Sequence, residues 1–116
     1  MPNKEKHLQQ YRKNINLANS ELLKECQYSD WRITTIFYAA MHLLDSSYAT
    51  IWHPPTHEKR KNFLYDTSQY TNIIDDYENL EMLSRKARYK CINMMESEVE
   101  SALENLQCIE DVIKNI

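Results

Sequence analysis

Three polar side chains in the middle of the chain fall on one face of an expected helix. Tyr38, His42 and Asp45 are separated by four and three residues, the steps that bring side chains together on one side of a helix. In a catalytic interpretation, Asp45 orients His42 as a base or a proton donor. The alternative is a buried structural histidine whose ring is satisfied by a neighbouring carboxylate.

A second pair, His57 and Arg60, lies three residues apart at the start of another expected helix. The unpaired backbone amides and the dipole at such a position favour an anion, so a phosphate group is the expected ligand. Glu58 and Lys59 lie beside this pair, and an exposed run of mixed charges is equally typical of a solvated face. Both interpretations stay open.

A third group is found in the run SRKARY, where Arg85, Arg88 and Tyr89 fall within about one turn. Cations near the end of a helix offset the negative end of its dipole, which explains this cluster without any ligand. Two guanidinium groups beside a phenol also suit a phosphate and a base, through forked hydrogen bonds and stacking. We therefore treat Arg85, Arg88 and Tyr89 as candidate nucleotide- or phosphate-binding residues.

The sequence gives no reason to expect a metal ion or a cofactor. The four histidines contain no HExxH pair and lie near no cysteine pair. Three widely spaced cysteines, Cys26, Cys91 and Cys108, allow neither a full disulfide framework nor a CxxC knuckle. No stretch approaches the roughly 20 apolar residues that cross a bilayer, and the N-terminal sequence lacks an apolar signal core. We expect a cytoplasmic protein without contact to a membrane.

Composition narrows the fold class to helical proteins. Hydrophobic residues make up 42% of the 116 residues and charged residues 27%, which is typical of one folded domain over residues 1–116. Glycine is absent and only three prolines occur, which argues against β-rich folds and against nucleotide folds built on glycine loops. The net charge of −3 gives no basis for broad nucleic-acid binding, and any basic patch must be local.

Apolar residues recur at helical spacing through most of the chain. They predict helices over residues 4–25, 31–50 and 57–65, a fourth helix that begins after Asn72, and a fifth near the C-terminus. Ser29 or Asp30 is expected to cap the second helix and Thr56 the short third one. His53-Pro54-Pro55 ends the second helix, because proline lacks the amide donor and disfavours helical geometry in the preceding residue.

The last helix carries the most regular apolar stripe. Asn93 followed by Glu96 reads as a capping box and favours a break near residues 89–92, although one continuous helix with the fourth is an alternative. Such a stripe packs either on the chain's own core, which we favour for so small a domain, or on a partner. The stripe alternates steps of three and four residues: Ile92, Met95, Val99, Ala102, Leu106, Ile109, Ile113 and Ile116.

Three segments together resemble the HEPN family. They are DWRITTIFYAAMH, PPTHEKR and the stretch that ends in SRKARY. The resemblance implies an all-α fold, a HEPN-like four-helix bundle with a short extra helix after the second long one. Such proteins often dimerise, and they occur in toxin–antitoxin, defence and RNA-processing systems, sometimes beside a nucleotidyltransferase. Arg88 and Tyr89 match the pair that often ends the corresponding family helix, while Lys90 stands where a proline frequently follows.

Nuclease members of this family cut RNA without metal, using an arginine that is followed a few residues later by a histidine. This chain lacks that order, since His57 precedes Arg60. The first hypothesis is therefore a module that binds nucleotide or RNA phosphate through His57, Arg60, Arg85 and Arg88. The alternatives are a metal-independent endoribonuclease, with His57 or His42 as base and an arginine stabilising the charged phosphate, and a non-catalytic dimerisation or adaptor protein partnered with a nucleotidyltransferase.

Aromatic residues give a separate reason to expect a homodimer. The chain holds more of them than so small a domain readily buries, and tyrosine and tryptophan are enriched at interfaces. In the expected dimer, two copies bring Arg85 and Arg88 toward a shared groove, where a bound phosphate offsets their repulsion. The aromatic residues considered are Trp31, Tyr38, Tyr48, Trp52, Tyr65, Tyr70, Tyr77 and Tyr89.

Overall fold

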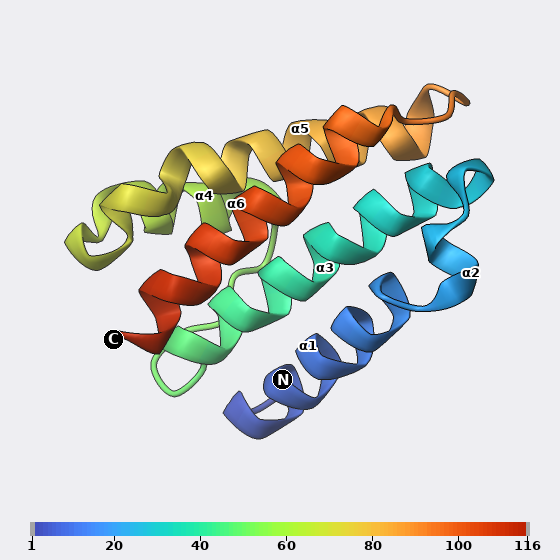
Figure 1. The fold of residues 1–116 in the computed structure, drawn as a ribbon. Helices are drawn as coiled ribbons and strands as arrows, with labels where there is room; N and C mark the ends of the chain where they lie inside the picture. The colour runs from blue at the N-terminus through green and yellow to red at the C-terminus, as the bar shows by residue number, and fades with distance from the viewer. Residues whose placement is uncertain (1, 116) are drawn as a thin grey trace.

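The computed structural model describes residues 2–115, and within that range the chain is helical without any strand (Figure 1). The all-α prediction is therefore confirmed. The elements in chain order are α1 (Lys4–Ala18), α2 (Glu21–Lys24), the 3-10 helix η1 (Cys26–Tyr28), α3 (Ser29–Tyr48), α4 (His57–Asp66), the 3-10 helix η2 (Ser68–Ile73), α5 (Ile74–Tyr89) and α6 (Glu96–Lys114).

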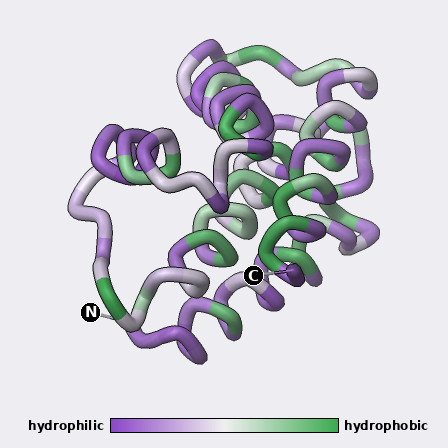
Figure 2. The backbone as a smooth tube through the Cα atoms, turned by 90° about the vertical axis from the view of Figure 1, so that its left-hand side faces the viewer, coloured by the Kyte–Doolittle hydropathy of each residue, from purple (hydrophilic) through white to green (hydrophobic). Residues whose placement is uncertain are grey.

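Helix α3 occupies the centre of the molecule. It packs against α1 on one side and against α5 and α6 on the other. Ile33, Ile36, Phe37, Ala40 and Leu44 are all fully buried on it, and full burial of a large apolar side chain stabilises the fold by about 1.5–3 kcal/mol. In Figure 2 the hydrophobic bands of the central helices contrast with the hydrophilic residues on the outside.

Helix starts confirm part of the expected capping. The Thr56 hydroxyl accepts from the Lys59 amide at 3.1 Å, so α4 begins at His57 as predicted. Helix α3 begins earlier than expected, and neither Ser29 nor Asp30 caps it. The Ser29 hydroxyl instead accepts from the Met94 amide and donates to the Met94 carbonyl. These two hydrogen bonds tie the start of α3 to the segment before α6.

The prediction of one helix over residues 4–25 was wrong. Helix α1 ends at Ala18, whose carbonyl accepts from the Arg32 side chain. The Ser20 hydroxyl then accepts from the Leu23 amide and starts the separate helix α2. Similarly, Asn72 does not cap α5, because it lies inside the 3-10 segment that precedes Ile74. Neither break carries the glycine or proline that would have marked it.

The expected break before α6 is confirmed, and the continuous-helix alternative is wrong. The chain turns through Cys91, which has a positive φ of 54°. The predicted box at Asn93 was wrong, since the Met95 amide donates to the Glu98 carboxylate at 2.8 Å. Val99, Ala102, Leu106 and Ile109 are buried in the chain's own core, whereas Ile92 and Met95 are exposed. Ile116 lies outside the described residues.

Candidate anion-binding site

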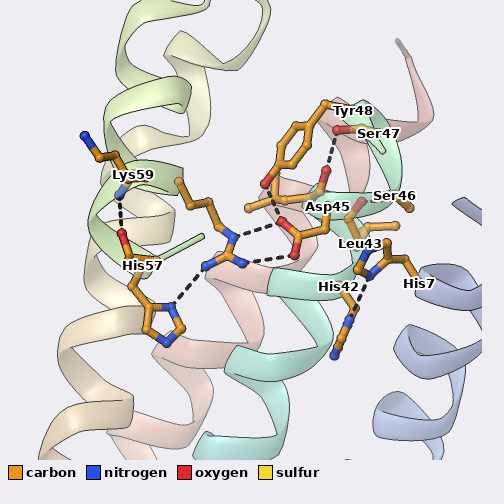
Figure 3. Close-up of polar contacts among 12 residues, drawn as sticks. His7, His42, Leu43, Asp45, Ser46, Ser47, Tyr48, His57 and Lys59 are labelled. Carbon is orange, nitrogen blue, oxygen red and sulfur yellow. Dashed lines mark hydrogen bonds and ion pairs between the residues drawn. The ribbon is translucent and has the colours of Figure 1, made fainter. Parts of the chain in front are cut away.

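A buried ion pair joins α3 to α4. The Nε and Nη2 atoms of Arg60 donate to the two carboxylate oxygens of Asp45 at 2.9 and 3.0 Å, and the Tyr48 hydroxyl donates to the same carboxylate. Arg60 is 6% exposed and Asp45 5%. Burial alone would lower the pKa of Arg60, but the Asp45 hydrogen bond and charge outweigh it and raise that pKa. Arg60 thus links α3 to α4. Its guanidinium is hydrogen-bonded to Asp45 and to His57 (Figure 3).

His42 lies apart from this ion pair, against α1. Its Nδ1 atom is 3.1 Å from Nδ1 of His7, and Figure 3 shows His42 and His57 on opposite sides of Asp45. Burial lowers the pKa of both His7 and His42. Both interpretations of His42 from the sequence pair its ring with a carboxylate, but the Asp45 oxygens bind Arg60 and Tyr48 instead. His42 therefore contributes to the contact between α1 and α3.

Several of the remaining candidate residues lie around the ring of Phe37 on α3. Its ring centroid lies 5.7 Å from that of His57 and 5.9 Å from the guanidinium carbon of Arg88. The same guanidinium carbon is 5.7 Å from the Tyr38 ring and 5.1 Å from the Tyr89 ring. The structure thus brings candidates from three separate sequence segments, on α3, α4 and α5, to one place.

The hydrogen bond of His57 fixes its tautomer. Arginine only donates, so the 3.0 Å contact between Arg60 Nη1 and His57 Nδ1 makes Nδ1 the acceptor. The proton of the neutral ring is then on Nε2. Burial and the positive charge of Arg60 lower the pKa of His57, and Arg88 and Arg85 act in the same direction against Glu81. His57 is therefore held as a neutral donor.

Arg88 differs from the other two arginines of the cluster in its partners. It donates to the Ser84 carbonyl at 3.2 Å, to the Ser84 hydroxyl at 3.3 Å and to the Tyr38 hydroxyl at 3.1 Å. All three acceptors are neutral, and within residues 2–115 no carboxylate lies within 4.0 Å of Arg88. A partly buried charge normally has a counter-charge. Arg88 is thus a positioned cation that makes no ion pair with any carboxylate among the described residues.

Arg85 and Tyr89 form the exposed rim of this cluster. Arg85 donates to Glu81 at 2.7 Å but keeps 63% of its side chain exposed, and Tyr89 is 71% exposed. Both line an open groove of about 870 Å³ along α5, with Lys61 of α4 at its side. Arg88 and His57 do not line that groove, so the cluster borders it.

Two residues of this region escaped the sequence analysis, Glu81 and Ser84. Glu81 is 6% exposed and one of its carboxylate oxygens is buried without a hydrogen-bond partner among the described residues. Ser84 is fully buried and positions Arg88. Their four-residue spacing from Arg85 and Arg88 was the available signal.

A metal site and a membrane-spanning helix each place definite requirements on residues 2–115. Among the residues that it describes, no group of three or more histidine, cysteine, aspartate or glutamate side chains is placed to hold a metal ion. Over the same residues, no helix is both long and apolar enough to span a membrane. No family model, no curated protein and no solved structure matches this chain.

Proposed function

We propose that this chain is a HEPN-like module, a four-helix bundle in that family's sense, which binds the phosphate of a nucleotide or of RNA at Arg88. The proposal rests on the geometry of Arg88. Its partly buried guanidinium is held by three neutral acceptors beside aromatic rings. A bound anion would give Arg88 the ion-pair partner that no described carboxylate provides.

His57, Arg85 and Tyr89 can add to the contact that Arg88 makes with a phosphate. Of the five N–H groups of Arg88, three are used within the protein, which leaves two for a phosphate. His57 adds its Nε2–H as a neutral donor, and the exposed Arg85 adds charge at the rim. Tyr89 offers an exposed ring on which a base stacks, a contact worth about 1–3 kcal/mol.

The tautomer of His57 favours binding over cleavage. A general base needs a free ring nitrogen to accept the proton of the attacking hydroxyl. In this structure Nδ1 of His57 is occupied by Arg60 and Nε2 carries the proton. His42, the other candidate base, lies against His7 on the far side of the ion pair. We therefore rank the endoribonuclease second.

The decisive experiment compares two arginine variants. The protein is titrated at low salt with a nucleoside triphosphate and with short single-stranded RNA, and binding is measured by calorimetry. Arg88→Ala is expected to weaken binding at least about tenfold, because one charged hydrogen bond contributes roughly 1.5–3 kcal/mol. Arg12→Ala is the matched control, since Arg12 is an exposed arginine on α1 that pairs loosely with Glu5.

Two results would overturn the proposal. One is the absence of saturable binding by the wild-type protein at low salt, and the other is undiminished binding by Arg88→Ala. Incubation with RNA in EDTA separates the alternative function, for which we expect intact RNA. Cleavage that disappears in His57→Ala would establish the endoribonuclease instead.

A further inference from the structure

Two carboxylates lie at one end of the groove along α5. Asp75 and Glu78 line this end, while Tyr89 and Lys90 line the other. Glu78 is 11 residues and Asp75 14 residues before Tyr89, which corresponds to about 16 and 21 Å along the helix axis. The groove therefore starts beside the proposed phosphate site and leads toward acidic side chains.

The acidic end of the groove is not neutralised by nearby cations. Among the described residues, no cation lies within 4.0 Å of Asp75 or Glu78, so Lys61 at the side of the groove is paired with neither. Asp76 adds a third carboxylate in the first turn of α5. The positive end of the helix dipole also lies there, but it amounts to only about half an elementary charge. This end of the groove stays negative.

The end of the groove beside Arg88 has the opposite charge. Lys90 is exposed, and over residues 2–115 it has no carboxylate within 4.0 Å. Lys86 adds no free charge, because Glu98 of α6 holds it at 2.6 Å, and Arg85 has its own carboxylate partner. Arg88 and Lys90 are thus the cations at this end that make no ion pair within the described part of the chain.

This charge distribution distinguishes the end of a nucleic-acid strand from its interior. A nucleotide whose phosphate meets Arg88 and whose base stacks on Tyr89 lies at the basic end, since the two side chains are in contact. A strand advances at least about 3.4 Å per nucleotide, so a strand that continued along the groove would bring a phosphate to Glu78 within about five nucleotides. Repulsion between the two negative groups acts over a Debye length of about 10 Å.

An interior nucleotide has a strand on both of its sides, whereas a terminal nucleotide has a strand on one side only. From the basic end, one direction leads past Lys90, where the charge favours phosphate. The other direction leads toward Glu78 and Asp75, where it does not. A terminal nucleotide needs only the favourable direction.

We propose that this site binds one terminal nucleotide, either a free nucleotide or the last nucleotide of a single strand, and that Asp75 and Glu78 exclude the interior of a strand. The inference rests on the proposed function, because it requires the phosphate contact at Arg88. It adds a selection by repulsion, which specific sites use against wrong partners alongside attraction to the right one.

A circular RNA tests this selection, because it has no end. Binding to the wild-type protein is measured at low salt for a nucleoside triphosphate, for a linear single-stranded RNA with a terminal phosphate, and for a circle of the same sequence. The terminal phosphate gives the linear strand and the circle the same number of phosphates. We expect the circle to bind at least about tenfold more weakly than the linear strand, because like charges brought together disfavour a complex.

Neutral variants identify the carboxylates responsible. Asp75→Asn with Glu78→Gln removes both charges at nearly constant shape, and it should tighten binding of the circle at least about fivefold. Glu100→Gln with Glu104→Gln is the matched control. These two residues are exposed on α6, do not line the groove, and remove the same net charge when replaced. The control should still bind the circle weakly, and circular dichroism should show that both variants are folded.

The outcomes separate this inference from the proposed function. Equal affinity of the wild type for circle and linear strand would overturn the inference and leave the phosphate site in place. An equal gain for the circle in the groove variant and in the α6 control, or no gain in either, would also overturn it. Binding of the nucleoside triphosphate but of neither RNA would support it, with the free nucleotide as the ligand. A wild type that binds none of the three would remove the proposed function and the inference with it.

Discussion

The Nδ1 atoms of His7 and His42 lie 3.1 Å apart, so at most one proton occupies the space between them. His7 is 6% exposed, and the His53 ring is 6.1 Å from the His7 ring. Three of the four histidines in the chain thus gather where the start of α1 meets α3. Asp45 opposes the lowered pKa values of both rings, whereas Arg60 reinforces them.

Acid should therefore destabilise the protein through this pair. Burial keeps the pKa of both rings below the ordinary value of 6.5, so the unfolded chain binds more protons than the folded one near and below pH 6.5. Stability is complete above that pH and falls as the pH drops through it. Urea unfolding at pH 7.5 and 5.5 should show a smaller acid loss for His42→Gln than for the wild type. An equal loss in both proteins would exclude the pair as its source.

Removing one partner of the buried ion pair should be costly. Asp45→Ala leaves the Arg60 charge buried without a counter-charge, and we expect a loss of about 3–5 kcal/mol in the free energy of unfolding. Replacing both partners, Asp45→Leu with Arg60→Met, should recover part of that loss. Glu5→Ala removes the exposed pair with Arg12 and should cost less than about 1 kcal/mol. Similar effects of Asp45→Ala and Glu5→Ala in urea unfolding would contradict this account.

The hydroxyl of Ser29 satisfies both backbone groups of Met94, at 2.8 and 3.0 Å. Ser29→Ala leaves these buried groups without a partner and should cost about 1–3 kcal/mol. Hydrogen exchange should show faster exchange of the Met94 amide in the variant. Thr35→Ala is the comparison, because its hydroxyl only returns to the Trp31 carbonyl within α3. Unchanged exchange at Met94 would mean that the turn is held by other contacts.

Cys91 is the one residue between positions 2 and 115 with a positive φ. A side chain with a Cβ atom is disfavoured in that region, whereas glycine is not. Cys91→Gly should therefore raise the melting temperature, with a gain of about 0.5–1 kcal/mol. Cys91→Ala keeps the Cβ atom and should give no such gain. If both variants behave alike in thermal unfolding, the backbone at this position is not the cause.

Local sequence signals predicted the features that depend on neighbouring residues. Thr56 after two prolines predicted the start of α4, and the apolar period predicted the buried side of α6. The breaks after Ala18 and before Ile74 carry no glycine or proline, so propensity alone could not find them. The end of α1 also involves the Arg32 side chain of α3, which donates to the Ala18 carbonyl.

In the candidate site, the sequence predicted which arginines to consider but not which partners they contact. Residue types and spacing selected Arg60 and Arg88 as members of basic clusters. Their roles differ because Asp45 lies 15 residues before Arg60 and Tyr38 lies 50 residues before Arg88. Whether an arginine meets a carboxylate or a hydroxyl depends on how α3 packs against α4 and α5, which sequence periodicity does not encode.

The central position of α3 also governs how the chain folds as it is synthesised. When α1 and α3 have left the ribosome, the side of α3 that carries Phe37 and Ile33 still lacks α5 and α6, the helices that cover it. The bond from Ser29 to Met94 spans 65 residues and closes only after residue 94 has emerged. Until then the nascent chain exposes its most apolar helix. Chaperones bind a growing protein, and aggregation competes with folding, during this period.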